Sequence, residues 1–492
     1  MKKLLNLLVV LLVFLFFSCS SSKSENDSDI IPDADADTQD SETQDDDSDS
    51  QDSEIVDDSD GTPNADEDSS TEEDLDDEEE EEEIDDTDRI NGYKRCYDEV
   101  PDEPYEGLFA DKKIESKVKQ ILEYDGDHEL TEEDLEKITE ITLSVKDIRG
   151  VEKLVNLEYV IISTGKIYDY TPLSKLEKLK KVVIHALSMT CLDGSFSFLT
   201  NLETLEIRET KLTDVSPVEQ LVNLKSLKLC ENYQIEFLPK HLGNLQNLEN
   251  LALSYNNIKT VKPVSSLTNL KKLYFHYNHI EDISPVKKLV NLTEFGAQSN
   301  QIKDISAVTK LVNLTWLGLS QNHIEAIPKD LVNLKKLRDI ELDYNNIANL
   351  PDLKGLDSLV IMALSDNDLN DEDLMKLDGL ENVQFLYVAL NKKITKVPIM
   401  KNLKSLQELY LNYNSITDLS GFADNESFPT LKNLDVGSNK IENVEAFRNR
   451  KGLSILRVDK NCIKDFSPLE ELKEQGTHVG GMGEQLESCE DK

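Results

Sequence analysis

The fold is decided by a stretch near the middle of the chain, LENLALSYNNI from Leu248 to Ile258, and by a second copy, LKKLYFHYNHI from Leu270 to Ile280. Both fit the pattern L-x-x-L-x-L-x-x-N-x-I. Fifteen such copies follow one another, mostly 22 residues apart, with 19 and 25 as the extreme spacings. They begin at Ile138, Leu157, Leu179, Leu202, Leu224, Leu248, Leu270, Leu292, Leu314, Leu337, Leu359, Val383, Leu406, Leu431 and Leu453.

The spacing within one copy predicts the shape of one repeat. Alternate residues of a strand point to the same side, so the leucines of L-x-L point inward and their neighbours outward. Strands of successive copies then stack in parallel, about 4.8 Å apart. A 22-residue copy leaves little room for a full return helix, so we expect 3₁₀ turns and short helices there. The sequence therefore predicts an α/β leucine-rich repeat solenoid, with its parallel β-sheet on the concave face.

An asparagine recurs after the predicted strand in the last eleven copies and is expected to close the turn. Its amide can donate to, and its oxygen accept from, backbone groups that a tight turn leaves unpaired. The first four copies have Lys146, Gly165, Leu187 and Thr210 instead, so we expect less regular coils there. The predicted ladder runs through Asn232, Asn256, Asn278, Asn300, Asn322, Asn345, Asn367, Asn391, Asn414, Asn439 and Asn461.

Both ends of the array need caps, because a terminal coil would expose its core. Apolar residues at helical spacing predict a helix over 112–124, and Thr131 is placed to cap a second one over 130–138. A last helix is expected over 467–475. These expectations give an N-terminal cap at 93–133, the repeat array at 134–463 and a C-terminal cap at 464–492.

The return segments carry a family resemblance. IEDISPVKKLVNL (Ile280–Leu292) and LTDVSPVEQLVNL (Leu212–Leu224) resemble the repeats of internalins and related bacterial surface leucine-rich repeat proteins. The resemblance covers about Gly107 to His478 and implies a helical N-terminal cap. Cys462 and Cys489 likewise resemble the disulfide-closed C-terminal cap of exported repeat proteins.

Three other cysteines allow several pairings. Cys96 could pair with Cys191, or Cys191 with Cys230, and the odd count leaves at least one thiol free. No C-x-x-C motif is present, so neither a redox nor a zinc motif is indicated.

The N-terminus is typical of an export signal. Two lysines precede an apolar run from Leu4 to Phe17, which fits a secretory signal better than a membrane span. Cys19 follows directly, and this arrangement resembles a bacterial lipoprotein cleavage site. Residues 1–18 are then a signal peptide, Cys19 is lipidated, and the chain is tethered at the outer membrane or cell surface. Ordinary cleavage near Ser20 would instead give a secreted protein.

The following segment is strongly acidic. Residues 20–88 hold 34 Asp and Glu against one Lys, so they carry −33 of the formal net charge of −45. We expect residues 19–92 to be a lipid anchor and disordered linker, and such charge to repel nucleic acid. The stretch from Asp58 to Asp66 also resembles one incomplete copy of an Asp-rich calcium loop.

No catalytic motif is found. The sequence has no P-loop, G-x-G-x-x-G, H-E-x-x-H or nucleophile motif, so we expect neither an enzyme nor a bound cofactor or metal. His276, His279 and His323 lie in adjacent copies and are best interpreted as polar turn surface.

The third, fifth and seventh residues of each copy should face outward on the concave sheet. Gly296, Gly318 and Ala363 would leave room for a partner, and Tyr255, Tyr277, Tyr344 and Tyr413 line one edge at the eighth position. Aromatic side chains bury much area with few rotors, so they suit protein contacts. The candidate partner-binding residues are Tyr274, His276, Trp316, Asp339, Glu341, Asp343, Phe385, Tyr387 and Tyr410.

These patterns predict an exported, membrane-tethered, monomeric protein that binds a protein partner on its concave face. The row Asp339, Glu341 and Asp343 favours a partner with a basic patch. Two alternatives remain open. One is an envelope-organising repeat protein without a discrete ligand. The other is a scaffold that resembles phosphatase regulators, against which the export signal argues.

The variant Cys19→Ser tests the tether. Without the lipidated cysteine, the protein should move from the membrane fraction to a soluble extracytoplasmic pool. Fractionation and immunoblotting measure this. A variant that stays in the membrane fraction would mean that the apolar run is an uncleaved anchor, and a wild type that is already soluble would mean ordinary secretion.

Overall fold

The computed structural model describes residues 89–90, 92–94, 104–163, 167, 169–185 and 189–489. The predicted signal peptide, Cys19, the acidic linker, the calcium-loop copy at 58–66 and Cys96 all lie outside these residues. So do Gly165 and Leu187, two of the positions that lack a ladder asparagine.

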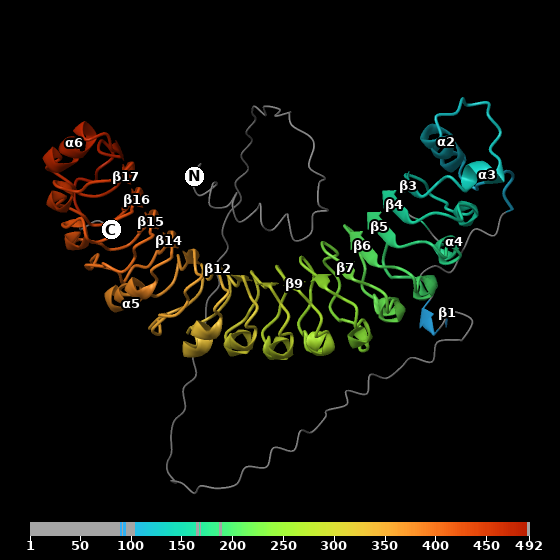
Figure 1. Cartoon of the computed structure of the whole chain (residues 1–492), viewed down its shortest axis with the longest axis horizontal. Helices are drawn as coiled ribbons and strands as arrows, with labels where there is room; N and C mark the ends of the chain where they lie inside the picture. The colour runs from blue at the N-terminus through green and yellow to red at the C-terminus, as the bar shows by residue number, and fades with distance from the viewer. Residues whose placement is uncertain are drawn as a thin grey trace, which may run out of the picture. The chain divides into compact units, whose positions relative to one another are not determined.

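The described array is one open sheet of sixteen strands, in the order β18 to β3, and every neighbouring pair is parallel. Figure 1 shows the strands along the inner side of the curved array and the short helical turns along its outer side. The predicted solenoid is therefore confirmed. The strands are β3 (Glu140–Leu143), β4 (Tyr159–Ser163), β5 (Lys181–His185), β6 (Thr204–Arg208), β7 (Ser226–Lys228), β8 (Asn250–Ala252), β9 (Lys272–Tyr274), β10 (Glu294–Gly296), β11 (Trp316–Gly318), β12 (Asp339–Glu341), β13 (Ile361–Ala363), β14 (Phe385–Tyr387), β15 (Glu408–Tyr410), β16 (Asn433–Asp435), β17 (Ile455–Arg457) and β18 (His478–Gly480).

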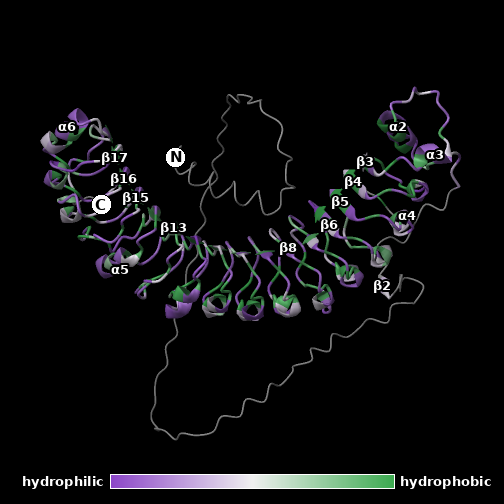
Figure 2. Ribbon diagram, in the orientation of Figure 1, coloured by the Kyte–Doolittle hydropathy of each residue, from purple (hydrophilic) through white to green (hydrophobic). Residues whose placement is uncertain are grey.

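The strand leucines build one continuous core. Leu273, Phe295, Leu317 and Ile340 pair in register across β9–β12, and each side chain is fully buried. Figure 2 shows hydrophobic stretches, in green, alternating with hydrophilic ones in coil after coil. Strands β3–β17 fall on the fifteen predicted copies, so the sequence register is correct throughout.

The asparagine ladder closes each turn as predicted. Asn322 donates from its amide nitrogen to the carbonyls of Ala297, Leu319 and Ser320, at 2.9, 2.9 and 3.3 Å. Its amide oxygen accepts from the N–H of Ile302 at 3.0 Å. Each asparagine thus bonds to the backbone of the coil before it. Among the first copies, which lack the asparagine, the Thr210 hydroxyl donates to the side-chain oxygen of Asn232, and Lys146 is exposed.

A second asparagine ladder was not anticipated from the sequence. The asparagine of the V-N-L segment donates to a carbonyl one coil earlier, as Asn291 does to Thr268 at 2.9 Å and Asn313 to Val290 at 2.9 Å. These bonds lie beside the return segments and tie successive coils on the side away from the first ladder.

The return segments are mostly 3₁₀ turns, as expected. An aspartate two residues before the serine often starts the turn, as where Asp282 accepts from the N–H of Ser284 at 2.7 Å. The elements are η2 (Val151–Lys153), α4 (Thr171–Ser174), η3 (Gly194–Phe198), η4 (Ser216–Gln220), η5 (Leu242–Asn244), η6 (Lys262–Ser266), η7 (Ser284–Lys288), η8 (Ser306–Lys310), η9 (Lys329–Asn333), α5 (Asp371–Lys376), η10 (Leu377–Gly379), η11 (Ser420–Phe422) and η12 (Glu445–Phe447).

Helices flank the array at its start. A short antiparallel pair, β1 (Arg89–Ile90) and β2 (Tyr93–Lys94), precedes α2 (Lys112–Ile121) and α3 (Glu132–Leu135). Thr131 caps α3 through a reciprocal hydrogen-bonded box with Asp134, and Ile114 and Val118 of α2 are buried in the core.

The C-terminal end closes with α6 (Ser467–Glu474) and strand β18, and the sequence had not predicted that strand. A disulfide joins Cys462 to Cys489, with their Cα atoms 5.7 Å apart. Cys191 and Cys230 are also disulfide-bonded, so none of the four cysteines in the described ranges is a free thiol. Among the described residues, no helix is both long and apolar enough to cross a membrane.

The core and ladder predict a stability series. Leu317→Ala or Leu342→Ala removes a fully buried side chain, so each should lower the free energy of unfolding by about 2–5 kcal/mol. Asn322→Ala leaves backbone groups unpaired and should lower it by about 1–3 kcal/mol. Urea denaturation measures this, with Val312→Ala, whose side chain is 48% exposed, as the matched control. Equal stability of all four variants would refute the register.

Candidate functional site on the concave face

The nine candidate residues all lie at inner-face positions of the sheet, but they differ in exposure. Tyr274, His276 and Asp343 are buried, at 8%, 1% and 4% exposure. The other six are half-buried. The buried three are therefore wrong as direct contacts for a partner, and the reason lies in the side chains of neighbouring coils.

The first group, which we call the Trp316 cluster, consists of Tyr274, His276, Trp316, Gln298 and Glu341. The Trp316 ring centre lies 6.2 Å from that of Tyr274 and 6.1 Å from that of His276. The indole N–H donates to Glu341 at 3.1 Å, and the amide of Gln298 donates to the same carboxylate at 2.7 Å. The Tyr274 hydroxyl donates to Glu294 outside the cluster. The polar side chains of the cluster are thus bonded within this chain, and its aromatic rings pack on one another.

Gly296 and Gly318 leave room for the side chains of this cluster rather than for a partner. A Cβ atom on Gly296 would lie 2.3 Å from the His276 ring, and one on Gly318 would lie 2.6 Å from the Trp316 ring. The space expected for a ligand is already filled by this chain's own side chains, so that prediction is wrong. Sequence spacing alone could not reveal this. The space at Gly296 is filled by His276 and Trp316 from the coils on either side, and the space at Gly318 by Trp316 of its own strand.

Burial also changes the charges expected here. Burial lowers the pKa of His276 to about 3, so this histidine is neutral and is not the polar turn residue that we expected. Burial raises the pKa of Glu341, and the hydrogen bonds from Trp316 and Gln298 partly oppose this. Burial raises the pKa of Asp343 to about 7, opposed by the bond from the Ser365 N–H at 2.7 Å. The acidic row is therefore largely engaged within the chain.

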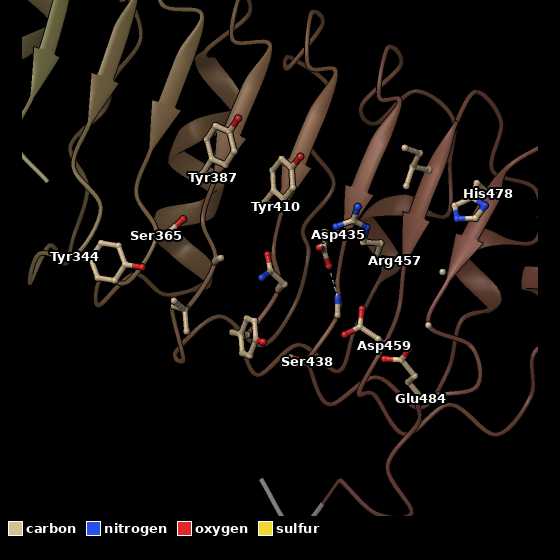
Figure 3. Close-up of a pocket in the computed structure, with 18 residues that line it drawn as sticks. Tyr344, Ser365, Tyr387, Tyr410, Asp435, Ser438, Arg457, Asp459, His478 and Glu484 are labelled. Atoms are coloured by element: carbon tan, nitrogen blue, oxygen red, sulfur yellow. Dashed lines mark hydrogen bonds and ion pairs between the residues drawn. The ribbon is translucent and has the colours of Figure 1, made fainter. Parts of the chain in front are cut away.

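A second group lies open on β14–β18, and we call it the tyrosine pocket. Tyr387 and Tyr410 stack with ring centres 4.9 Å apart and planes 12° apart. They border a hollow of about 620 Å³ that also includes Asp435, Arg457 and Asp459 (Figure 3). Phe385 lies two residues before Tyr387 on β14 but does not line this hollow.

The tyrosine pocket is predominantly acidic. Arg457 lies 3.7 Å from Asp435, while Asp459 and Glu484 add two further carboxylates to the wall. The Tyr410 hydroxyl donates to Glu408 at 2.9 Å, and burial raises the pKa of Tyr387 to about 12. Both phenols therefore stay neutral at physiological pH, and each ring offers an apolar surface beside negative charge.

Sequence reasoning found the two tyrosines but missed the rest of this pocket. Asp435 and Arg457 occupy the fifth, inner-face positions of the next two copies, so the spacing of the repeat could have identified both residues. His478 and Glu484 come from the strand β18 and the tail after it, which lie beyond the repeat pattern.

The remaining candidate features are peripheral. His279 and His323 are exposed, and Tyr255 stacks on Tyr277 at 4.5 Å along one edge of the array. No group of three or more His, Cys, Asp or Glu in the described part of the chain is arranged to hold a metal ion.

Comparison with known proteins agrees with this architecture. A family model described as leucine-rich repeats in two copies matches residues 246–288, 381–424 and 404–449. The chain is a leucine-rich repeat solenoid. Lumican of Mus musculus is 33% identical over 139 residues, which cover 27% of this chain and 38% of lumican. The solenoid thus matches well under half the length of this curated relative.

Two solved structures match most of the solenoid. An internalin of Listeria monocytogenes is 27% identical, with a TM-score of 0.55, over 76% of this chain and 95% of the internalin. A leucine-rich repeat protein of Leptospira interrogans is 23% identical, with a TM-score of 0.58, over 71% and 97% of the two chains, and shows the fold alone. The structural neighbours therefore include internalin-like repeat proteins.

The variant Asp343→Asn should change how stability depends on pH. With its pKa raised to about 7, folded Asp343 keeps a proton that the unfolded chain loses above about pH 4. The contribution of Asp343 to the free energy of unfolding should therefore fall as pH rises through this window and stay low above it. Asparagine can accept the Ser365 N–H without a charge, so the variant should be the more stable protein above pH 7.

Urea denaturation at several pH values measures this difference. His276 titrates in the opposite sense, but it is present in both proteins and cancels from the comparison. Parallel stability curves for the two proteins would contradict the assignment of a buried, protonated Asp343.

Proposed function

We propose that this chain is an exported, membrane-tethered protein that binds a protein partner through its concave face. The observation that carries the proposal is the tyrosine pocket, where stacked aromatic rings border an open acidic hollow on five consecutive strands. Tyrosines offer large contact area at low entropic cost, and they are frequent anchors of protein interfaces. A partner with a Lys or Arg side chain near an apolar residue fits this chemistry.

The proposed binding region is narrower than the one expected from sequence. Trp316 is held by Tyr274, His276 and Glu341, so its role is to stiffen the middle of the sheet. Tyr387 and Tyr410 have only partial burial, and one hydrogen bond, from Tyr410 to Glu408, positions the pair. We therefore place the partner's anchor over β14–β18.

The proposal of export rests on one feature of the sequence and one feature of the structure. The apolar run Leu4–Phe17 followed by Cys19 supports a cleaved and lipidated signal. The disulfide between Cys462 and Cys489 supports an oxidising compartment, because such bonds are rare in reducing cytosol. Under this proposal the acidic residues 20–88 separate the solenoid from its anchor.

A matched pair of double variants tests the binding face. Tyr387→Ala with Tyr410→Ala removes the stacked pair of the tyrosine pocket. Tyr255→Ala with Tyr277→Ala removes a stacked pair of the same chemistry at the edge of the array. We expect the first to weaken partner binding by at least about 2 kcal/mol, or roughly 30-fold in Kd, and the second to leave it nearly unchanged.

The full chain, immobilised in each form, captures partners from envelope extract, and the retained protein is then titrated directly. All forms carry the same acidic segment, so charge-driven capture by that segment cancels from the comparison. No protein retained above background would favour an envelope-organising role without a discrete ligand. Equal losses in the two double variants would place the binding face elsewhere.

A further inference from the structure

One edge of the array, along the starts of the strands, holds another hollow, which we call the edge hollow. It has a volume of about 540 Å³ and spans the coils of β11–β15. The residues of its lining that bear on binding are Arg338, Asp357, Val360, Asn382, Gln384 and Ser405.

The edge hollow lies where the ladder of V-N-L asparagines is interrupted. Asn291 and Asn313 belong to that ladder, but Lys336 and Ser358 occupy the same position in the next two copies. Ser405 occupies it again two copies later. Because a serine is shorter than an asparagine, the edge is recessed there and the polar groups around it stay accessible.

Arg338 brings an unpaired positive charge into the edge hollow. Within the described part of the chain, its guanidinium forms no hydrogen bond or ion pair. Thr315 and Val360 lie beside it in register on the neighbouring coils, and neither is charged. Nearer the start of the array the same position holds opposite charges that pair, as Lys180 does with Glu158 at 3.0 Å. Arg338 therefore lacks the charged neighbour that Lys180 has.

Four further polar groups of the edge hollow have no hydrogen-bond partner among the residues that the structure describes. They are the carboxylate of Asp357, the side-chain oxygen of Asn382, the amide nitrogen of Gln384 and the hydroxyl of Ser405. The two amides are held through their other atoms. Asn382 donates to the Asp357 carbonyl at 2.7 Å, and Gln384 accepts from Gln407 at 3.2 Å. Acceptors and donors thus lie together beside the guanidinium.

This set of groups favours a ligand that carries one carboxylate and several hydroxyls. A guanidinium binds a carboxylate through two parallel hydrogen bonds, and a hydroxyl can donate to Asp357 or Asn382 and accept from Gln384 or Ser405. A simple anion would use only the donors, and Asp357 would repel it. A free amino acid would leave most of the neutral groups unused. Val360 offers an apolar surface to the C–H face of a sugar ring.

We propose that the edge hollow binds an acidic saccharide, with Arg338 holding the carboxylate of a uronic acid residue. Asp357 and Asn382 accept from the hydroxyls of the sugar, and Gln384 and Ser405 donate to them. The volume of the hollow lies within the range of roughly 300–1,000 Å³ that is typical of ligand pockets. The site is independent of the proposed protein partner, because none of its lining residues belongs to the tyrosine pocket.

Saturation-transfer difference NMR on the full chain, with methyl glucuronide as the probe, tests this site. Methyl glucoside lacks the carboxylate and should bind at least about tenfold more weakly, the difference expected for one charge-assisted hydrogen bond. Arg338→Gln should weaken glucuronide binding by a similar factor. Asp357→Ala should weaken glucuronide binding but strengthen binding of acetate, because this carboxylate accepts from sugar hydroxyls and repels a bare anion.

Lys432→Gln is the matched control. It removes a cation from the same repeat position on the same edge, outside the hollow, and should bind the glucuronide as wild type does. Circular dichroism melting checks that each variant is folded. The double variant Tyr387→Ala with Tyr410→Ala should also bind the glucuronide normally, so this proposal and the proposed function can fail separately.

Several outcomes would overturn the saccharide site. These are no saturation transfer to methyl glucuronide from the wild type, or equal losses in Lys432→Gln and Arg338→Gln. Tighter glucuronide binding by Asp357→Ala, or equally tight binding of acetate and glucuronide to the wild type, would assign the hollow to simple anions. Tighter binding of free glycine than of the glucuronide would assign it to amino acids.

Discussion

The structure depends on one repeated interaction, the side-chain amide of an asparagine bonded to the backbone of two successive coils. Asn322 binds three carbonyls and one N–H, and its neighbours in the ladder repeat this geometry. The residue before each asparagine adopts a left-handed backbone, with φ of 53° at Tyr277 and 56° at Tyr344. Such a conformation costs about 1–2 kcal/mol for a non-glycine residue, and the asparagine bonds offset it.

This constraint lets the spacing of residues in the sequence determine which side chains are neighbours on the inner face. Because the ladder fixes the register of every coil, residues 22 positions apart become neighbours on the inner face, as Glu294 and Trp316 do. Side chains that could contact a partner therefore lie in rows that run across the strands. The Trp316 cluster and the tyrosine pocket occupy the same inner-face positions on different strands. In the first the aromatic rings pack on one another, whereas the second borders an open hollow.

The fold was predictable because its signal is local and repeated. The register of β3–β17 and the roles of Asn232 to Asn461 follow from spacing alone. The site was only partly predictable. Its position in the repeat could place Trp316 on the inner face, but could not show that its ring occupies the space beside Gly296 and Gly318. Likewise β18 has no repeat consensus, so the wall formed by His478 and Glu484 was missed.

Hydroxyl-radical footprinting of the full chain, alone and in the complex captured from envelope extract, tests the central claim most directly. The account predicts that Tyr387 and Tyr410 lose reactivity in the complex. Trp316 should react equally in both states, because its contacts are made within the chain. Unchanged tyrosine reactivity, with protection instead at Phe237, a 62% exposed residue of a return segment, would contradict it.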